Sequence, residues 1–160
     1  MCTATVLLAL LLLACVSTAP TNDKGAKSSR KQGLMPAGKR SLYEFRLMIE
    51  CETGRNAFDF NRYGCWCGMG GGGNPVDDID VCCMEHDHCY TQAEYHCTWP
   101  GQIYWDLYRR IGCSECDAGN NSPCEQALCE CDAQAARCFR DNLNQYDAGF
   151  KSHPVEACHA

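Results

Sequence analysis

The sequence predicts a mainly α, disulfide-rich fold. Residues 42–51 and 123–143 carry apolar side chains at helical spacing, and residues 77–95 open with a helix-start signal. Sixteen of the 160 residues are cysteine, and a glycine-rich stretch lies between residues 42–51 and residues 77–95. We therefore expect an N-terminal helix, a glycine-rich loop, two long antiparallel helices and a small β-hairpin in the turn-rich residues 100–121.

The first 40 residues are predicted to lie outside this fold. Residues 4–16 are an uncharged apolar run, long enough for a signal-peptide core and too short to span a membrane. The polar stretch that follows holds six of the fourteen Lys and Arg residues and ends in a dibasic pair, which favours a propeptide over a solvated basic linker. We assign residues 1–19 to a signal peptide whose end is approximate, 20–40 to a propeptide, and 41–160 to the mature, secreted domain.

Fourteen of the sixteen cysteines fall in residues 41–160. An even number of cysteines behind a secretory signal predicts disulfides rather than free thiols. Each native bridge contributes roughly 2–4 kcal/mol by restricting the unfolded chain, which supplements the modest core of a small domain. The same residues contain 19 Asp and Glu against 8 Lys and Arg, a formal net charge of −11, which argues against a nucleic-acid partner. No transmembrane segment is predicted.

The first helix is predicted from Leu42, Phe45, Met48 and Ile49, which share one face. In the loop that follows, five of the eight residues from Gly68 to Pro75 are glycine, so the backbone there can adopt positive φ and direct carbonyls toward one point. Such oxygen ligands, with a carboxylate, suit Ca²⁺. A flexible surface loop is the alternative, whereas a P-loop is excluded because no Lys-Ser/Thr follows.

The second helix begins after Pro75, where Asp77, Asp78 and Asp80 favour the positive end of a helix dipole. His86 and Tyr90 are spaced i,i+4, and Asp87 lies between them in angle, so all three share a face. Asp87 can supply a metal carboxylate, and His86 a base that titrates near neutrality. A zinc cluster with the neighbouring cysteines is disfavoured, since they should be oxidised.

The last helix places a carboxylate, Asp132, inside its apolar stripe. A buried carboxylate is costly unless it is hydrogen-bonded, so Asp132 needs a partner. It is either a satisfied structural residue or the group that orients the ring of His86, leaving the other ring nitrogen free to take a proton.

Four stretches of the chain, taken together, resemble the secreted phospholipase A2 family. They are SLYEFRLMIEC, YGCWCGMGG, CCMEHDHCY and CECDAQAARCF, and the match covers nearly all of residues 41–160. The Cys-Cys-x-x-His-Asp-x-Cys signature is specific. The fourteen-cysteine layout is similar to the pancreatic and elapid type, which implies a calcium-binding loop and a catalytic domain secreted as a zymogen.

The resemblance implies roles for individual residues. The carbonyls of Trp66, Gly68 and Gly70 and the carboxylate of Asp87 would hold Ca²⁺. Three further groups would form the catalytic network: His86 would activate the water that attacks the sn-2 ester of a glycerophospholipid, Asp132 would hold His86, and Tyr90 would hydrogen-bond Asp132. Trp66 replaces the usual tyrosine, a change that a backbone ligand tolerates.

A second tyrosine beside the aspartate is expected from the resemblance, and its position is ambiguous. Counting back from Cys113 reaches Arg109, a one-residue shift reaches Tyr108, and Tyr104 lies four residues earlier. We expect Tyr108. The spacing from Cys113 to Cys116 also implies a shortened hairpin. The resemblance further implies the pairs Cys51–Cys113, Cys65–Cys158, Cys67–Cys83, Cys82–Cys138, Cys89–Cys131, Cys97–Cys124 and Cys116–Cys129.

A family member without activity, acting as a toxin, receptor ligand or matrix protein, is the alternative function. Loss of activity usually follows loss of the base, the metal carboxylate or the loop glycines, and all of these are present. The expected partner is a phospholipid aggregate or membrane surface, bound peripherally. The resemblance places Leu42, Tyr43, Phe58 and Met69 around the mouth of the substrate channel.

Overall fold

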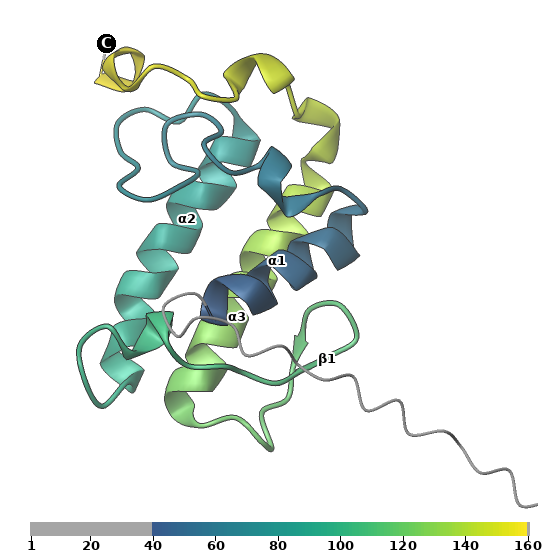
Figure 1. Ribbon diagram of the computed structural model, residues 1–160, viewed down its shortest axis with the longest axis vertical. Helices are drawn as coiled ribbons and strands as arrows, with labels where there is room; N and C mark the ends of the chain where they lie inside the picture. Colours follow the sequence, from purple (N-terminus) through teal and green to yellow (C-terminus); the bar gives the residue numbers. More distant parts are fainter. Residues whose placement is uncertain (1–39, 160) are drawn as a thin grey trace, which may run out of the picture. The chain divides into compact units, whose positions relative to one another are not determined.

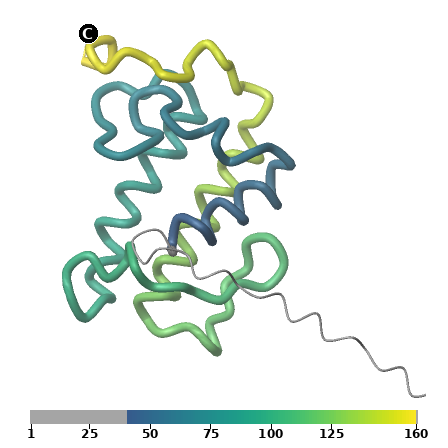
Figure 2. Tube along the Cα trace, in the orientation of Figure 1, coloured from purple at the N-terminus to yellow at the C-terminus, as the bar shows by residue number. Residues whose placement is uncertain are grey.

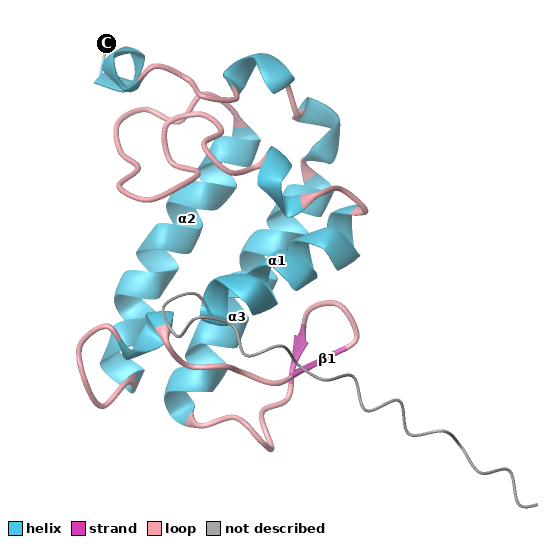
Figure 3. Ribbon diagram, in the orientation of Figure 1, coloured by secondary structure: helices cyan, strands magenta, loops and turns pink. Residues whose placement is uncertain are grey.

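The computed structural model describes residues 40–159. The predicted signal peptide and nearly all of the predicted propeptide therefore lie outside the described residues. Within these residues the α-helices are α1 (Arg40–Thr53), α2 (Asp78–Ala93) and α3 (Pro123–Asp141), and the strands are β1 (Arg110–Ile111) and β2 (Glu115–Cys116). Short 3₁₀ turns connect them, coloured with the helices in Figure 3. The predicted mainly α fold is confirmed, and no described helix is long and apolar enough to cross a bilayer.

The scaffold of the domain is the pair α2 and α3. The two helices run antiparallel, and the Cα trace shows α1 lying over α3 (Figures 1 and 2). The disulfides Cys82–Cys138 and Cys89–Cys131 cross-link α2 to α3 in the order that antiparallel helices require. The core between the helices contains fully buried apolar side chains, among them Met48, Ile79, Leu128 and Phe139.

The helix starts follow from their capping residues. At the start of α2, the Asp77 carboxylate accepts a hydrogen bond from the Asp80 N–H at 2.9 Å. At the start of α3, Ser122 and Glu125 form a reciprocal capping box, and Pro123 occupies the first turn. Both helices end two residues before the predicted boundaries, because a 3₁₀ turn takes over where an α-helix was expected to continue.

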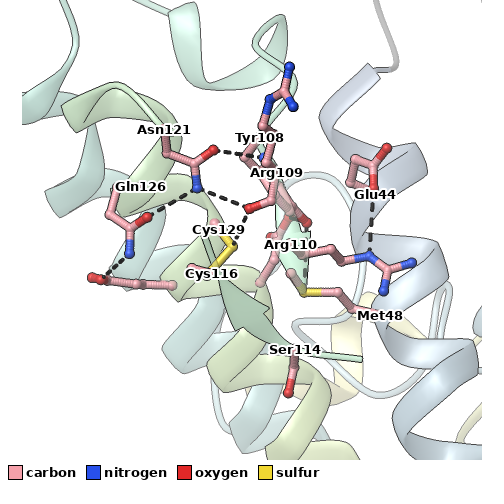
Figure 4. The surroundings of a disulfide bond; sticks show 12 residues. Glu44, Met48, Tyr108, Arg109, Arg110, Ser114, Cys116, Asn121, Gln126 and Cys129 are labelled. Atoms are coloured by element: carbon pink, nitrogen blue, oxygen red, sulfur yellow. Dashed lines mark hydrogen bonds and ion pairs between the residues drawn. A yellow bond between two sulfur atoms is a disulfide. The ribbon is translucent and has the colours of Figure 1, made fainter. Parts of the chain in front are cut away.

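The hairpin is smaller than a typical one, as its cysteine spacing predicted. Its two-residue strands pair Arg110 with Cys116 and Ile111 with Glu115. The Cys116–Cys129 disulfide fixes β2 to α3, and the Asn121 side chain bonds both backbone polar groups of Arg109 (Figure 4). These covalent and polar contacts hold a segment that two short strands would not stabilise alone.

The disulfide pairing implied by the resemblance is present in full. The seven bridges are Cys51–Cys113, Cys65–Cys158, Cys67–Cys83, Cys82–Cys138, Cys89–Cys131, Cys97–Cys124 and Cys116–Cys129. Two of them anchor the glycine-rich loop, and two join the long helices. The bridges thus tie the loop to the helices that carry the predicted catalytic residues.

A polar cluster around Glu52 joins α1, the hairpin turn and α3. The Glu52 carboxylate accepts hydrogen bonds from the Ser114 hydroxyl and from Arg140 Nη1, the latter at 2.8 Å. The Ser114 hydrogen bond, followed by the nearby Arg140, lowers the pKa of Glu52 below its ordinary value of 4.5. The ionised carboxylate therefore contributes its full stabilisation of the folded protein at pH values above the ordinary pKa of 4.5, and this contribution is lost as the pH falls through the lower folded-state pKa.

We predict that Glu52→Gln lowers the free energy of unfolding by about 1 kcal/mol near neutral pH, because an ionised acceptor is replaced by a neutral one. The loss should be smaller at an acidic pH below the folded-state pKa, where the wild-type carboxyl is protonated too. Guanidinium denaturation with the disulfides intact measures both values. Glu85→Gln, at an exposed position on α2, is the matched control and should change neither. A Glu52→Gln loss of equal size at both pH values would contradict the assignment.

Candidate active site

The glycine-rich loop has the backbone conformation that its glycines permit. Gly68 has φ 149° and Gly70 has φ 80°, both in the region that other residues rarely adopt. A Cβ added at Gly71 would lie 2.6 Å from the Trp66 carbonyl oxygen, so only glycine allows the loop to fold back against this carbonyl. The residues present therefore fit a loop that exposes backbone oxygens to a hard cation.

A buried carboxylate, Asp80, holds this loop against α2. It is fully buried and accepts three backbone N–H groups, from Cys65 and Trp66 at 2.7 Å and from Val76 at 3.0 Å. Gly64 makes room for it, since a Cβ there would lie 2.3 Å from the Asp80 carboxyl carbon. The anchoring of the loop depends on this one side chain.

The importance of Asp80 was missed in the sequence, where it was interpreted only as a helix-start residue. A signal was available. Asp80 lies three residues before Cys83, and these positions share a helix face. Because Cys83 is bridged to Cys67 in the loop, Asp80 had to face the loop as well.

The indole of Trp66 closes the loop from the other side. Its Nε1–H donates to the Gly73 carbonyl at 3.1 Å, and its ring packs against the His88 ring on α2 in a T-shaped arrangement, with centroids 5.6 Å apart and planes at 74°. A tryptophan at this position thus has a structural role besides the carbonyl that its backbone offers.

The predicted catalytic residues meet at Asp132. The Asp132 carboxylate is fully buried, and its Oδ1 lies 2.7 Å from His86 Nε2. Tyr90 donates to Oδ1 and Tyr108 to Oδ2, each at 2.7 Å. Tyr104 is instead half-exposed, and within residues 40–159 its hydroxyl forms no hydrogen bond with the Asp132 carboxylate. The hydrogen bonds that a buried carboxylate requires are therefore supplied by α2 and by the segment before the hairpin.

The two tyrosines remain proton donors at neutral pH. Burial, followed by the negative charge of Asp132, raises the pKa of both Tyr90 and Tyr108 above the usual value for a phenol. Because both hydroxyls keep their protons, Asp132 remains the acceptor of the network. His86 Nε2–H is then the donor to Asp132, which leaves Nδ1 as the nitrogen with a free lone pair.

Helix α1 supplies a wall that sequence reasoning did not assign to the site. The Phe45 ring stacks on His86 with centroids 4.3 Å apart and planes at 17°. The Met48 sulfur lies 3.7 Å from the Tyr108 hydroxyl oxygen, whose proton is donated to Asp132, so Met48 packs against the hydroxyl. Phe45 and Met48 were predicted to share an apolar face, but which groups this face would cover could not be read from helical spacing alone. The imidazole is held on one side by a ring and at one edge by a carboxylate.

Asp87 follows His86 directly and differs from Asp132 in its surroundings. Burial raises the pKa of its carboxyl group, an effect that the adjacent His86 opposes. Its carboxylate oxygens have no hydrogen-bond or ion-pair partner within residues 40–159. A half-buried carboxylate without such a partner is suited to a cation, whose charge would offset the cost of burial.

Comparison with known proteins supplies the family. The family model described as Phospholipase A2 matches residues 42–151. The chain belongs to the phospholipase A2 family. It is 44% identical over 119 residues to the basic phospholipase A2 Tpu-G6D49 of Craspedocephalus puniceus, covering 74% of this chain and 83% of that protein. It is 45% identical over 106 residues to an acidic phospholipase A2 of Micrurus dumerilii, covering 62% of this chain and 85% of that protein. The acidic phospholipase A2 5 of Echis pyramidum leakeyi is 40% identical over 119 residues, with 74% and 83% covered.

We predict that Asp80→Asn loosens the glycine-rich loop of this family member while the helix pair stays folded. The amide keeps one acceptor oxygen and presents N–H groups to backbone donors, which should cost about 1–3 kcal/mol. Hydrogen exchange at the amides of Cys65, Trp66 and Val76 should accelerate roughly tenfold or more. Asp78→Asn is the control, because Asp78 is exposed and its carboxylate accepts a hydrogen bond from the Gln145 side chain, so the substitution should leave these amides unchanged. Unaltered exchange in Asp80→Asn would show that the carboxylate does not hold the loop.

Proposed function

We propose that this chain is a secreted, calcium-dependent phospholipase A2 that hydrolyses the sn-2 acyl ester of glycerophospholipids to a lysophospholipid and a fatty acid. The observation that carries the proposal is the His86–Asp132 hydrogen bond of 2.7 Å next to the Asp87 carboxylate, which has no hydrogen-bond or ion-pair partner within residues 40–159. The seven disulfides support an extracellular location, since such bridges persist in oxidising compartments.

His86 is the proposed general base. With Nε2–H donated to Asp132, its Nδ1 can take the proton of a water molecule as that water attacks the ester carbonyl. Asp132 fixes the tautomer and the ring orientation and stabilises the imidazolium that forms. Tyr90 and Tyr108 hold both oxygens of Asp132, and Phe45 limits movement of the ring. The proton would later pass from Nδ1 to the departing alcohol oxygen of the lysophospholipid.

Ca²⁺ is the proposed cofactor, held by the carbonyls of Trp66, Gly68 and Gly70 and the carboxylate of Asp87. The positive φ of both glycines and the close approach of Gly71 to the Trp66 carbonyl support this ligand set. When bound, the cation would supply positive charge to the ester oxygen that becomes negative during attack. Asp80 and the Trp66 indole would hold the loop in the conformation that directs these carbonyl oxygens toward the ion.

The proposed partner is a lipid surface, approached through apolar side chains. Leu42, Tyr43, Phe58 and Met69 are exposed, and Met69 is fully so. Nearby cations are largely neutralised, because Arg46 pairs with Glu50 at 2.8 Å and Arg110 lies 3.7 Å from Glu44 (Figure 4). Exposed Arg109 has no ion-pair partner within residues 40–159, so a single free cation remains beside these pairs, and apolar insertion at the headgroup boundary is favoured over charge attraction.

We predict that His86→Gln lowers turnover roughly 10²–10⁴-fold, the usual contribution of a general base, with Ca²⁺ binding retained. Glutamine can still donate to Asp132, so the fold should persist.

Asp87→Lys should lose both turnover and Ca²⁺ binding, since the lysine ammonium replaces the cation's charge. Calorimetry measures the affinity, and hydrolysis of a dispersed monomeric ester measures the chemistry. A wild-type protein that binds Ca²⁺ without hydrolysing either monomeric or aggregated lipid would instead identify a family member without activity.

We predict that Phe58→Ser and Met69→Ser each weaken binding to zwitterionic vesicles about tenfold, because burying such a side chain is worth roughly 1.5–3 kcal/mol. Hydrolysis of monomeric ester should change much less than vesicle binding, because neither side chain is proposed to hold Ca²⁺ or to take part in proton transfer. Val155→Ser, at an exposed apolar position that is not one of these four side chains, is the matched control. Vesicle sedimentation at increasing salt and anionic lipid fraction provides the measurement. Binding that tightens steeply with anionic lipid and is lost in salt would contradict apolar docking.

A further inference from the structure

A partly buried ion pair lies close to Tyr108, two residues further along the chain. Glu44 on α1 and Arg110 on β1 face each other, with Arg110 Nε 3.7 Å from a Glu44 carboxylate oxygen (Figure 4). Each of these side chains is 20% exposed, whereas the side chains of the Arg46–Glu50 pair on the same helix are 43% and 29% exposed. Charges that are shielded from water interact more strongly with their surroundings than exposed charges do. Of these two pairs, Glu44–Arg110 is therefore the one that can act on its neighbours.

The guanidinium of Arg110 is anchored at one end and unsatisfied at the other. Its Nη1 donates to the carbonyls of Gly112 and Cys113 in the hairpin turn, the latter at 3.3 Å. Its Nε is buried and has no hydrogen-bond partner within residues 40–159, because 3.7 Å to Glu44 is too long for a hydrogen bond. A buried donor without a partner is costly. An arginine in this position therefore needs a compensating role.

Two contacts lie side by side between α1 and the segment that enters β1. Glu44 and Met48 are four residues apart on α1, so they share a face and are separated by about 6 Å along the helix. Tyr108 and Arg110 are two residues apart, and alternate residues of an extended chain point to the same side, about 6.6 Å apart. The two spans match, so Glu44 can meet Arg110 while the Met48 sulfur lies 3.7 Å from the Tyr108 hydroxyl oxygen (Figure 4). The ion pair thus determines how closely α1 lies on Tyr108.

The charges of the pair also act on the catalytic network. Burial raises the pKa of Glu44, Arg110 opposes this effect, and the negative charge of Asp132 adds to it. Burial and Asp132 are the main causes of the raised pKa of Tyr108, which Glu44 raises further and Arg110 lowers. Without Arg110, Glu44 would be a half-buried carboxylate without a cation, repelled by Asp132. Its hydration would draw the first turns of α1 away from Tyr108.

We propose that Arg110 is a positioning residue for the hydrolysis: paired with Glu44, it holds α1 against Tyr108 and so keeps the Tyr108 hydroxyl on Asp132. Its effect on turnover rests on the proposed function, whereas the contacts themselves do not. Arg109, the preceding residue, is exposed and has no ion-pair partner within residues 40–159. Two adjacent arginines therefore differ in role, since only the side chain of Arg110 reaches the network.

The first experiment follows the Tyr108 Cζ resonance by NMR in the folded chain, assigned with Tyr108→Phe. The shift of this carbon responds to the hydrogen bond of the hydroxyl, which lies 2.7 Å from the Asp132 carboxylate. Arg110→Gln and Glu44→Gln should each move the resonance toward the value of an exposed tyrosine. Arg109→Gln, next to Arg110, is the matched control and should leave it unchanged. A resonance that stays in place in both Arg110→Gln and Glu44→Gln would overturn the proposal.

The second experiment measures kcat and KM on a dispersed monomeric ester. Arg110→Gln should lower kcat about three- to tenfold with KM nearly unchanged, because the network is disturbed and substrate binding is not. Arg110→Lys keeps a cation beside Glu44 and should recover most of the loss. The double variant Arg110→Gln/Glu44→Gln leaves no lone charge, so its loss should be smaller than the two single losses combined. Glu50→Gln, in the exposed pair on α1, is the control for Glu44→Gln. Additive losses, or a change in KM alone, would contradict a positioning role.

The two experiments separate this inference from the proposed function. A wild-type chain that hydrolyses nothing, but whose Tyr108 resonance moves in Arg110→Gln, would contradict only the proposed function. An active chain whose Tyr108 resonance does not respond would contradict only the role of Arg110. Because Arg110 also holds the hairpin turn, near-ultraviolet circular dichroism checks the fold of each variant. If Arg110→Gln does not fold, Glu44→Gln decides the test, since it leaves the contacts of Arg110 with the turn in place.

Discussion

The buried Asp132 carboxylate is the group around which the candidate site is arranged. A carboxylate with no exposure is stable only when its oxygens are hydrogen-bonded, and here three side chains provide those bonds. Each donor comes from a segment that must therefore lie at a fixed distance from α3. The bonds from His86 and Tyr90 fix the position of α2 relative to α3, and the bond from Tyr108 fixes the segment just before the hairpin. The solvation requirement of one side chain thus determines the position of the imidazole.

A second buried carboxylate, Asp80, meets the same requirement in a different way. Its donors are backbone N–H groups, so it orders the course of the loop rather than the positions of side chains. Both acids project from the long helices, one toward the other helix and one toward the loop. Together the two carboxylates fix the position of the His86 ring relative to the glycine-rich loop, because both act through the long helices. The disulfide Cys67–Cys83 also joins this loop to α2 covalently.

Much of this arrangement was predictable, because helical spacing and cysteine pairing are properties of the chain. The helices, the hairpin and the meeting of His86 with Asp132 follow from spacing together with the family resemblance. The stacking of Phe45 on His86 was not predictable, since it depends on the angle at which α1 crosses its neighbours. Tyr108 was expected from the resemblance, whereas counting residues from Cys113 reached Arg109, and the structure places the Tyr108 hydroxyl 2.7 Å from Asp132 Oδ2. Spacing gives the face of a helix, and tertiary packing decides what that face contacts.

The link between the glycine-rich loop and Cys158 has a consequence for biosynthesis. Cys65 is bridged to a residue 93 positions later, and the Cys158 carbonyl accepts the Asn74 N–H at 2.8 Å. A Cβ at Gly73 would lie 2.2 Å from that same carbonyl, so the two segments fit closely. While the chain is being synthesised, the loop has neither its covalent partner nor this contact until Cys158 has emerged. During that interval Cys65 cannot form its native bridge, so this covalent link of the loop is made only after nearly the whole domain has been synthesised.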